Sequence, residues 1–434
     1  MIKSILKKII LFVLILEAKF VLRKYKPKII GVTGTVGKTS AKDAIASVLA
    51  LKYNVRKSEK SYNSEFGVPL TIIQEQSARG NIFGWVKIIL NGLSFLIKNK
   101  KYPEYLVLEM GIDRPKDMRK LMSWINLEIA VVTAVGAIPV HVEYFESSLA
   151  IAEEKAKIVE KLPKNGLAVL NADDQEVLSM RRKTYAKVVT YGFKGEITGA
   201  KGADVEASSY SIFEEDGKPV GTFCKVEHEG NIVPMRINGI FGKQAILSVL
   251  PAIAIGLEEG INLIKIVEKL SDFRQPPSRL SLIEGKGNTL IIDSTYNSSP
   301  IALQSSLEIL QEMSAKRKVA VLGDMLELGK YTAEEHRKIG VFAKSKADIL
   351  ITVGPRAKLI AEEGKRVKFG VKNIFTFQTK QEAIEALPKI IEEGDLVLIK
   401  GSQGMRMEKI VESLMVKPED AKKLLCRQEK EWKS

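Results

Sequence analysis

The sequence predicts an α/β protein in which a parallel-sheet domain with a small antiparallel β-patch is followed by a Rossmann-like α/β domain. Three observations support this prediction. Short apolar runs with the length of buried strands alternate with helical stretches along most of the 434 residues. A glycine-rich loop joins the first of these runs to a helix. Between Asp204 and Asn238, alternating segments are separated by turns at Asp216-Gly217 and Glu229-Gly230-Asn231, as expected for an antiparallel patch.

Changes in this pattern divide the chain into four parts. Residues 1–28 form a basic amphipathic segment, 29–272 the parallel-sheet domain, 273–416 the Rossmann-like domain and 417–434 a charged tail that we expect to be a solvated helix or a frayed end. A stiff linker, Gln275-Pro276-Pro277, marks the boundary between the two domains. In the second domain we expect strands at 289–293, 319–323, 349–353 and 396–400, alternating with helices.

Composition limits the possible functions. Hydrophobic residues make up 45% and charged residues 27% of the chain, as in soluble globular proteins. Two cysteines, Cys224 and Cys426, exclude a disulfide framework and a cysteine zinc site, and three histidines argue against a multi-histidine metal cage. The net charge of +15 indicates an anionic partner. No basic tract is interleaved with aromatic residues, so we do not expect this partner to be a nucleic acid.

The first 28 residues carry a local charge of +7, with Glu17 as their one acid. Ile2, Leu6, Ile9, Val13, Leu16 and Phe20 fall at helical spacing and form one apolar face. Three interpretations remain open, namely an anchor lying on anionic lipid, a membrane span, and a helix packed on its own domain. A second apolar face lies at 82–97, and the two together favour a membrane surface as a partner, although core packing is the usual reason for such a stripe.

The glycine-rich loop has the features of a phosphate-binding site. A buried strand, Lys28–Thr33, is followed by Gly34-Thr35-Val36-Gly37-Lys38-Thr39-Ser40 and a helical pattern at 41–51. Glycines let backbone N–H groups approach phosphates, and the helix N-terminus favours negative charge. The loop therefore predicts ATP binding, with Lys38 at the β- and γ-phosphates and the Thr39 hydroxyl on Mg²⁺. The candidate ATP-binding residues here are Thr35, Gly37, Lys38, Thr39 and Ser40.

Further motifs follow in a fixed order along the chain. They are Ser61–Pro69, Glu109-Met110-Gly111, Ala152-Glu153-Glu154-Lys155, Asp293–Pro300, Leu322–Gly329 and Lys400-Gly401-Ser402. With these motifs the sequence resembles the Mur ligase family from residue 29 to about residue 415. Members of that family carry a UDP-sugar domain ahead of the phosphate loop. Only about thirty residues precede Gly31, so we expect the basic segment to stand in place of that domain.

The resemblance implies an ATP-dependent, ADP-forming ligase that joins an acid to an amine through an acyl-phosphate, with ATP and Mg²⁺ as cofactors. Its branch implies that D-alanyl-D-alanine is joined to a muramoyl-peptide carboxylate in peptidoglycan synthesis, and hence a role in cell shape and cell division. Two alternatives are ligation of another carboxylate and amine, and a membrane-associated phosphate-loop ATPase. We expect a cytoplasmic monomer at the inner face of the membrane, with an anionic acceptor and a dipeptide amine as partners.

The resemblance also implies roles for individual residues. The catalytic set is Lys38, Glu109, His141, Lys155 and Arg279, with Lys155 as a carbamate. The metal ligands are Thr39, Glu109, His141 and Lys155. Asn63, Asp293, Tyr296 and Asn297 complete the cofactor-binding set, and Arg279 is expected to meet the ATP phosphates when the domains close.

Overall fold

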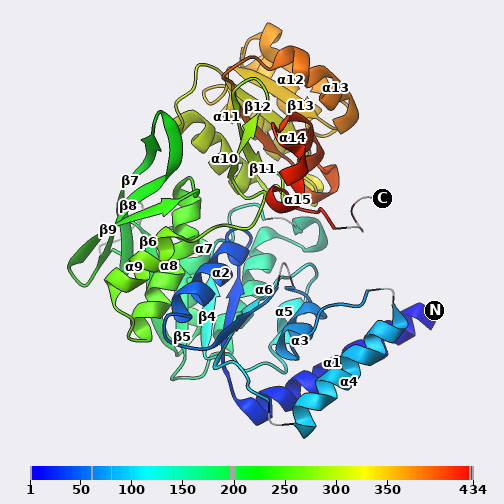
Figure 1. Cartoon of the computed structure of the whole chain (residues 1–434), viewed down its shortest axis with the longest axis vertical. Coiled ribbons are helices and arrows are strands. Elements are labelled where there is room, and N and C mark those ends of the chain that lie inside the picture. The colour runs from blue at the N-terminus through cyan, green and yellow to red at the C-terminus, as the bar shows by residue number, and fades with distance from the viewer. Residues whose placement is uncertain are drawn as a thin grey trace.

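The structure is a computed structural model that describes residues 2–59, 62–79, 81–98, 100–139, 141–195, 202–429 and 432. These residues form two α/β bodies, each built on one sheet (Figure 1). A pair of helices, α1 (Ile2–Tyr25) and α4 (Ile82–Ile97), lies along the edge of the first body that is remote from the second (Figure 1). The predicted α/β fold class is confirmed.

The first sheet has nine strands in the order β2-β3-β1-β4-β5-β6-β7-β8-β9. Pairing is parallel from β2 through β7. The parallel strands are β1 (Lys28–Thr33), β2 (Val55–Lys57), β3 (Tyr105–Glu109), β4 (Ile129–Val132), β5 (Leu167–Asn171) and β6 (Lys187–Phe193). From central β1 the chain builds β2 and β3 on one side and β4 to β6 on the other. The end of β1 is therefore the point where strand order reverses, and open α/β sheets bind their ligands at that point.

Helices cover both faces of this sheet because its strands are apolar on both sides. Ile30 and Val32 of β1 belong to the core under α2 (Lys38–Leu49), α8 (Lys243–Glu258) and α9 (Leu263–Ser271). Ile29 belongs to the opposite core, which also includes residues of α1, α3 (Gly67–Ile72), α4, α5 (Asp117–Leu121), α6 (Ser148–Glu160) and α7 (Gln175–Ser179). Two short 3₁₀ turns, η1 (Val142–Tyr144) and η2 (Met180–Lys183), complete this side.

The predicted antiparallel patch is present but is not a separate element. Strands β7 (Val205–Glu215), β8 (Lys218–His228) and β9 (Asn231–Asn238) pair antiparallel and extend the parallel sheet through β6 (Figure 1). At both predicted turns two successive residues have positive φ, 51° and 71° at Asp216-Gly217 and 48° and 78° at Glu229-Gly230. Such turns match the twist of the strands they connect.

Helix α1 (Ile2–Tyr25) packs against α3 and α4 (Ile82–Ile97). Its buried side chains Ile10, Leu14, Ala18 and Val21 belong to the core of the first body. Of the three interpretations of this segment, the structure shows the one in which the helix packs on its own domain. The contact does not use the predicted apolar face, because Leu6, Ile9, Leu16 and Phe20 are exposed. Among the described residues, no helix has both the length and the apolar character needed to cross a membrane.

The second sheet has six strands in the order β10-β11-β15-β12-β13-β14. Only β10 (Ser281–Gly285) runs antiparallel to its neighbour. The others are β11 (Thr289–Ser294), β12 (Lys318–Gly323), β13 (Ile349–Val353), β14 (Ile374–Phe377) and β15 (Leu396–Lys400). Four of these match the predicted strands, while β10 and β14 are edge strands that the sequence pattern missed. The helices are α10 (Pro300–Glu312), α11 (Thr332–Ala343), α12 (Lys358–Arg366), α13 (Lys380–Ile390) and α14 (Glu408–Leu414), with 3₁₀ turns η3 (Gly329–Tyr331), η4 (Val371–Asn373) and η5 (Gln403–Met405).

The prediction of a solvated or frayed tail after 416 was wrong for residues 421–427. After the 3₁₀ turn η6 (Pro418–Asp420), helix α15 (Ala421–Leu424) packs Ala421 into the core of the second body together with Leu425. Arg427 is only 8% exposed. The sequence did not predict this packing, because the segment is highly charged and its few apolar residues show no helical or strand periodicity.

Candidate active site

The phosphate loop lies between β1 and α2 and is fixed by the end of β4. Thr133 Oγ1 donates to Val36 O at 2.6 Å and to Thr33 O at 3.2 Å. Gly34 has φ 146°, and a Cβ at this position would collide with the Thr133 hydroxyl. Glycine is therefore required at Gly34 both for its backbone conformation and for this close approach. The predicted loop is confirmed as a strand–loop–helix unit.

Lys38 lies at the first position of α2 and bends back over the loop. Its Nζ donates to Gly34 O at 2.8 Å and to Thr35 O at 3.3 Å. Burial lowers the pKa of Lys38, while the nearby carboxylates of Glu109 and Asp113 act in the opposite direction. An ammonium held mainly by backbone carbonyls is poorly compensated, so a phosphate group in this loop would improve its electrostatic environment.

Lys155 reaches the same loop from α6. Its Nζ donates to Gly34 O at 3.0 Å, and the side chain is buried. Burial lowers the pKa of Lys155 well below its usual value, and the neighbouring charge of Lys38 lowers it further. Two amino groups from different helices thus share one carbonyl oxygen. A lysine in such a place is neutral more often than a surface lysine, and the neutral amine is the nucleophilic form.

Glu109 lies at the C-terminal end of β3 and is 2% exposed. Asn63 Nδ2 donates to its Oε1 at 3.4 Å, which brings two predicted site residues together. Lys42 Nζ lies 3.7 Å from Oε2, and Oε2 has no hydrogen-bond partner among the residues that the structure describes. Mg²⁺ is commonly held by one or two carboxylates together with substrate phosphates. The incompletely satisfied carboxylate at the loop therefore fits such an ion together with the Thr39 hydroxyl.

The structure places His141 at the boundary between the two bodies. Its Nδ1 lies 2.8 Å from Glu327 Oε2 in the second body, and its Nε2 lies 3.5 Å from Asp113 Oδ1. The interaction with His141 lowers the pKa of Glu327. Within the described part of the chain, no group of three or more His, Cys, Asp and Glu side chains is placed to hold a metal ion. The contacts of His141 are thus those of an interdomain residue, and its metal role stays a prediction.

Arg279 reaches from the second body to the phosphate loop. One guanidinium nitrogen donates to Thr39 Oγ1 at 3.0 Å, and the group lies 3.8 Å from the centre of the Tyr296 ring. Within the described part of the chain, the buried Arg279 Nε has no hydrogen-bond partner. The structure therefore brings Arg279, Tyr296 and Thr39 together, as expected for a site closed by both domains.

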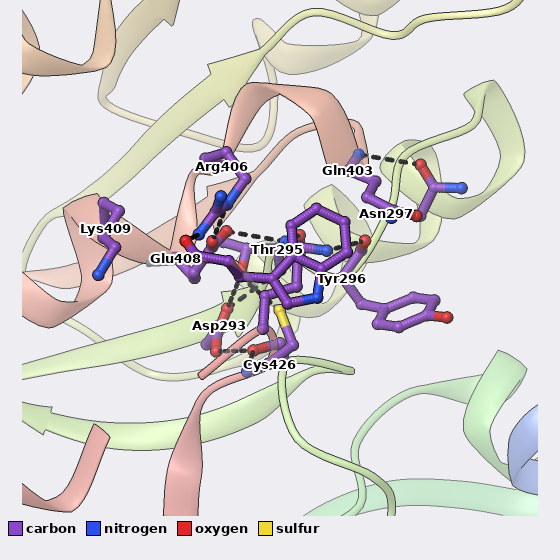
Figure 2. A network of polar contacts seen from close by, with 12 residues as sticks. Asp293, Thr295, Tyr296, Asn297, Gln403, Arg406, Glu408, Lys409 and Cys426 are labelled. Atoms are coloured by element: carbon purple, nitrogen blue, oxygen red, sulfur yellow. Dashed lines mark hydrogen bonds and ion pairs between the residues drawn. The ribbon is translucent and has the colours of Figure 1, made fainter. Parts of the chain in front are cut away.

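The other predicted residues of the second body belong to one polar network (Figure 2). Asp293 is fully buried and accepts from Ser278 Oγ at 2.6 Å and from Thr295 Oγ1 at 2.7 Å. Burial raises the pKa of Asp293, and the hydrogen bonds oppose this. Asn297 Oδ1 accepts from Gln403 N at 3.3 Å. The side chain of Tyr296 points out of the network (Figure 2). Asp293 thus orders the segment that presents Tyr296.

Arg427, in the segment after α15, also contributes to this polar network. Arg427 donates to Thr295 O at 2.6 Å, to Tyr296 O at 2.8 Å and to Glu408 Oε2 at 2.8 Å. Arg406 bonds the other oxygen of Glu408 at 2.6 Å (Figure 2). Arg427 thus binds the backbone carbonyls of Thr295 and Tyr296. It fixes the backbone position of Tyr296, although it makes no contact with the phosphate loop among its described hydrogen bonds.

Lys400 is a further buried amine and lies at the end of β15 in the second body. Its Nζ donates to Ser294 Oγ at 3.0 Å and to Asn297 O at 2.8 Å. Burial lowers the pKa of Lys400 to about 7, and the charge of Arg279 contributes. The sequence contained Lys400 in a motif but gave no reason to expect a buried amine without a carboxylate partner among the described residues.

Sequence reasoning missed Lys42, Asp113, Glu327 and Arg427. Lys42 follows Lys38 by four residues, so helical spacing could have placed both on one side of α2. Asp113 follows Gly111 at the end of β3, where ligand-facing residues gather in open sheets. Glu327 lies within a quoted motif, but its contact with His141 joins residues 186 positions apart. No local pattern reveals such a pair.

Two family models match the chain in succession. The Mur ligase middle domain matches residues 87–256, and the Mur ligase glutamate ligase domain matches residues 278–403. With both matches and the phosphate-loop geometry in place, the chain belongs to the Mur ligase family.

Similar proteins have one recurring name. UDP-N-acetylmuramoyl-tripeptide--D-alanyl-D-alanine ligase of Bacillus subtilis (strain 168) is 29% identical over 408 residues, which are 92% of this chain and 79% of the relative. The enzyme of the same name from Escherichia coli (strain K12) is 26% identical, with the same two coverages. The crystal structure of MurF ligase from Thermotoga maritima in complex with ADP superposes with a TM-score of 0.75 at 26% identity, covering 93% of this chain and 83% of that one.

Proposed function

We propose that the protein forms an amide between D-alanyl-D-alanine and the terminal carboxylate of a UDP-linked muramoyl tripeptide, with hydrolysis of ATP to ADP and phosphate. The observation that carries this proposal is the convergence of three basic side chains, Lys38, Lys155 and Arg279, on the phosphate loop. They come from α2, from α6 and from the second body. The named relatives supply the two substrates of the proposal.

The chemistry follows from where charge accumulates. A carboxylate oxygen of the acceptor attacks the γ-phosphorus, the bond to the β,γ-bridging oxygen breaks, and ADP leaves. The amine of the dipeptide then attacks the acyl carbon, loses a proton and expels phosphate. Lys38 and Arg279 stabilise the anionic oxygens in the first step. When bound, Mg²⁺ neutralises phosphate charge, and Thr39 and Glu109 are the residues that would hold it.

Lys155 is proposed to act as a carbamate. Its neutral Nζ attacks CO₂, an N–C bond forms, and the proton passes to solvent. The product is an anionic oxygen ligand in place of an amine. The buried position beside Lys38 supports this, because it favours the neutral amine before reaction and places a cation beside the anion afterwards.

The setting of the reaction is also part of the proposal. We infer a cytoplasmic enzyme that acts as a monomer at the inner face of the membrane. In support of the membrane setting, α1 and α4 expose apolar side chains beside lysines and arginines.

The test is a phosphate-release assay combined with mass spectrometry of the product. ATP, D-alanyl-D-alanine and UDP-N-acetylmuramoyl-tripeptide together should give phosphate and a pentapeptide product. Omission of the dipeptide should abolish both. Phosphate release that needs neither the dipeptide nor the acceptor would instead support a phosphate-loop ATPase. Activity confined to a lipid-linked acceptor would support ligation of another carboxylate.

A further inference from the structure

Helices α1 and α4 lie side by side at the edge of the first body (Figure 1). Twelve of the nineteen large hydrophobic side chains that are exposed in the described part of the chain belong to these two helices. Isolated exposed hydrophobic residues are normal in soluble proteins, but a contiguous group marks an interaction surface. We therefore expect this group of exposed apolar side chains to contact a binding partner.

Helix α1 has two apolar faces with different fates. One is buried against α3 and α4, with Leu14, Ala18 and Val21 completely inaccessible. The other faces solvent and consists of Ile5, Leu6, Ile9, Phe12, Leu16 and Phe20, which are 36–63% exposed. Because the first face is fixed in the core, the second is not needed for folding.

Helix α4 repeats this arrangement. Its N-terminus is capped by Asn81, whose side chain accepts from Gly84 N. Trp85, Ile88 and Phe95 are buried. The exposed face consists of Ile82, Phe83, Val86, Leu90, Leu93 and Ile97, with Phe83 at 82% and Ile97 at 83%. The water-facing side of a helix normally carries polar residues, so these exposed apolar side chains are unusual.

The exposed charges carried by these two helices are basic, although the partly exposed carboxylate of Glu75 contacts Asn91 of α4. Helix α4 contains no acidic residue, and the one acid of α1, Glu17, is buried next to Gly92 of α4. Exposed basic residues accompany both helices, namely Lys8, Arg23, Lys26, Lys87, Lys98 and Lys101. Basic residues beside an apolar helix face are typical of helices that lie in the interface of an anionic bilayer.

We propose that the exposed faces of α1 and α4 form one docking surface for an anionic lipid bilayer, with both helices in the plane of the interface. Apolar side chains enter the boundary between headgroups and acyl chains, and the lysines and arginines meet lipid phosphates. A second copy of the chain is a poorer occupant, since it would set two basic surfaces against each other. The inference rests on the membrane setting of the proposed function and deepens it, but it does not depend on the proposed ligation.

The experiment is sedimentation of the full chain with vesicles. Mixed phosphatidylcholine–phosphatidylglycerol vesicles should carry the protein to the pellet at low salt, and phosphatidylcholine vesicles should carry far less. Raising the ionic strength to about 0.5 M should release a large part of it, because the charge attraction is screened. Failure to bind the mixed vesicles, or binding that ignores both lipid charge and salt, would overturn the proposal.

Variants separate this surface from general stickiness. Phe83→Asp with Leu90→Asp changes two exposed residues of α4 and should weaken vesicle binding at least about tenfold, since two large apolar side chains are lost from the interface. The matched control is Ile264→Asp with Val341→Asp, which changes exposed residues of α9 and α11 and should bind normally. Equal loss in both variants would overturn the proposal, as would a dimer in solution that the α4 variant alone dissociates. ATP-dependent phosphate release in solution should be equal for all three proteins.

Discussion

Buried charges are treated differently in the two bodies. In the second body, Lys400 and Asp293 lack an ion-pair partner among the described residues, but the buried arginines are paired. Arg427 and Arg406 share the two oxygens of Glu408, and Arg317 pairs with Asp395 at 2.7 Å. In the first body, the amines of Lys38 and Lys155 bond backbone carbonyls, and Glu17 has no hydrogen-bond partner at either oxygen. Buried charges that are paired fix the geometry of the side chains around them. Buried charges without a charged partner are instead typical of sites that bind a ligand. The phosphate loop is therefore the reactive half of the site, and the second body supports it.

The largest effect should follow from removal of the Lys38 amine. Lys38→Ala should lower the turnover number by about 10³-fold or more, because a fixed cation at the phosphates is lost. The melting temperature should be unchanged or higher, since the amine is desolvated in the fold. A phosphate-release assay measures the turnover number, and a circular dichroism melting curve measures the melting temperature. Normal turnover would remove the loop from the reaction.

Lys155→Ala should lower turnover by about 10²-fold, a loss typical of removing a group that supports a metal site. Added short carboxylates should restore part of it by replacing the carbamate oxygen. Depletion of CO₂ should lower the activity of the wild-type protein and leave the variant unaffected. Full activity of the unsupplemented variant would show that Lys155 has only a structural role.

In the second body, a change should act on binding and stability rather than on chemistry. Arg427→Met should raise KM for ATP about tenfold with little change in kcat, because Tyr296 loses its backbone support. The unfolding free energy should fall by about 3 kcal/mol, since Glu408 loses one of its two buried partners. Steady-state kinetics and urea unfolding test this. Arg427→Lys, which keeps the charge, should recover part of both, and a selective fall in kcat would contradict the comparison.

The smallest effect concerns Glu17. Burial raises the pKa of Glu17 to about 7. The folded state therefore holds a proton that the unfolded state releases at a lower pH, so this group favours folding at acid pH, and stability is lost as the pH rises through about 7. Relative to the wild type, Glu17→Gln should gain about 1–2 kcal/mol of unfolding free energy between pH 5 and pH 8. Urea unfolding at both pH values measures it, and an equal difference at both would refute it.

Local pattern predicted much of the fold. The strand before the phosphate loop, four strands of the second sheet and the paired turns of the β-patch each depend on a few adjacent residues, so their sequence is sufficient evidence. The face by which α1 packs was not predictable, because the helix carries apolar residues on two sides and only the position of α4 decides between them. Arg427 was missed for a similar reason, since its partners lie 19 and 132 positions away in the chain.

The connections of the helix pair have a mechanical consequence. Helix α1 ends at Tyr25 and β1 begins at Lys28, and α4 ends at Ile97 before β3 begins at Tyr105. The two strands that carry the phosphate loop and Glu109 therefore both follow directly from the proposed docking surface. A bilayer that holds the helices would also fix the height and tilt of the reaction centre above it. The protein would then meet any acceptor confined to the same membrane by diffusion in two dimensions rather than three.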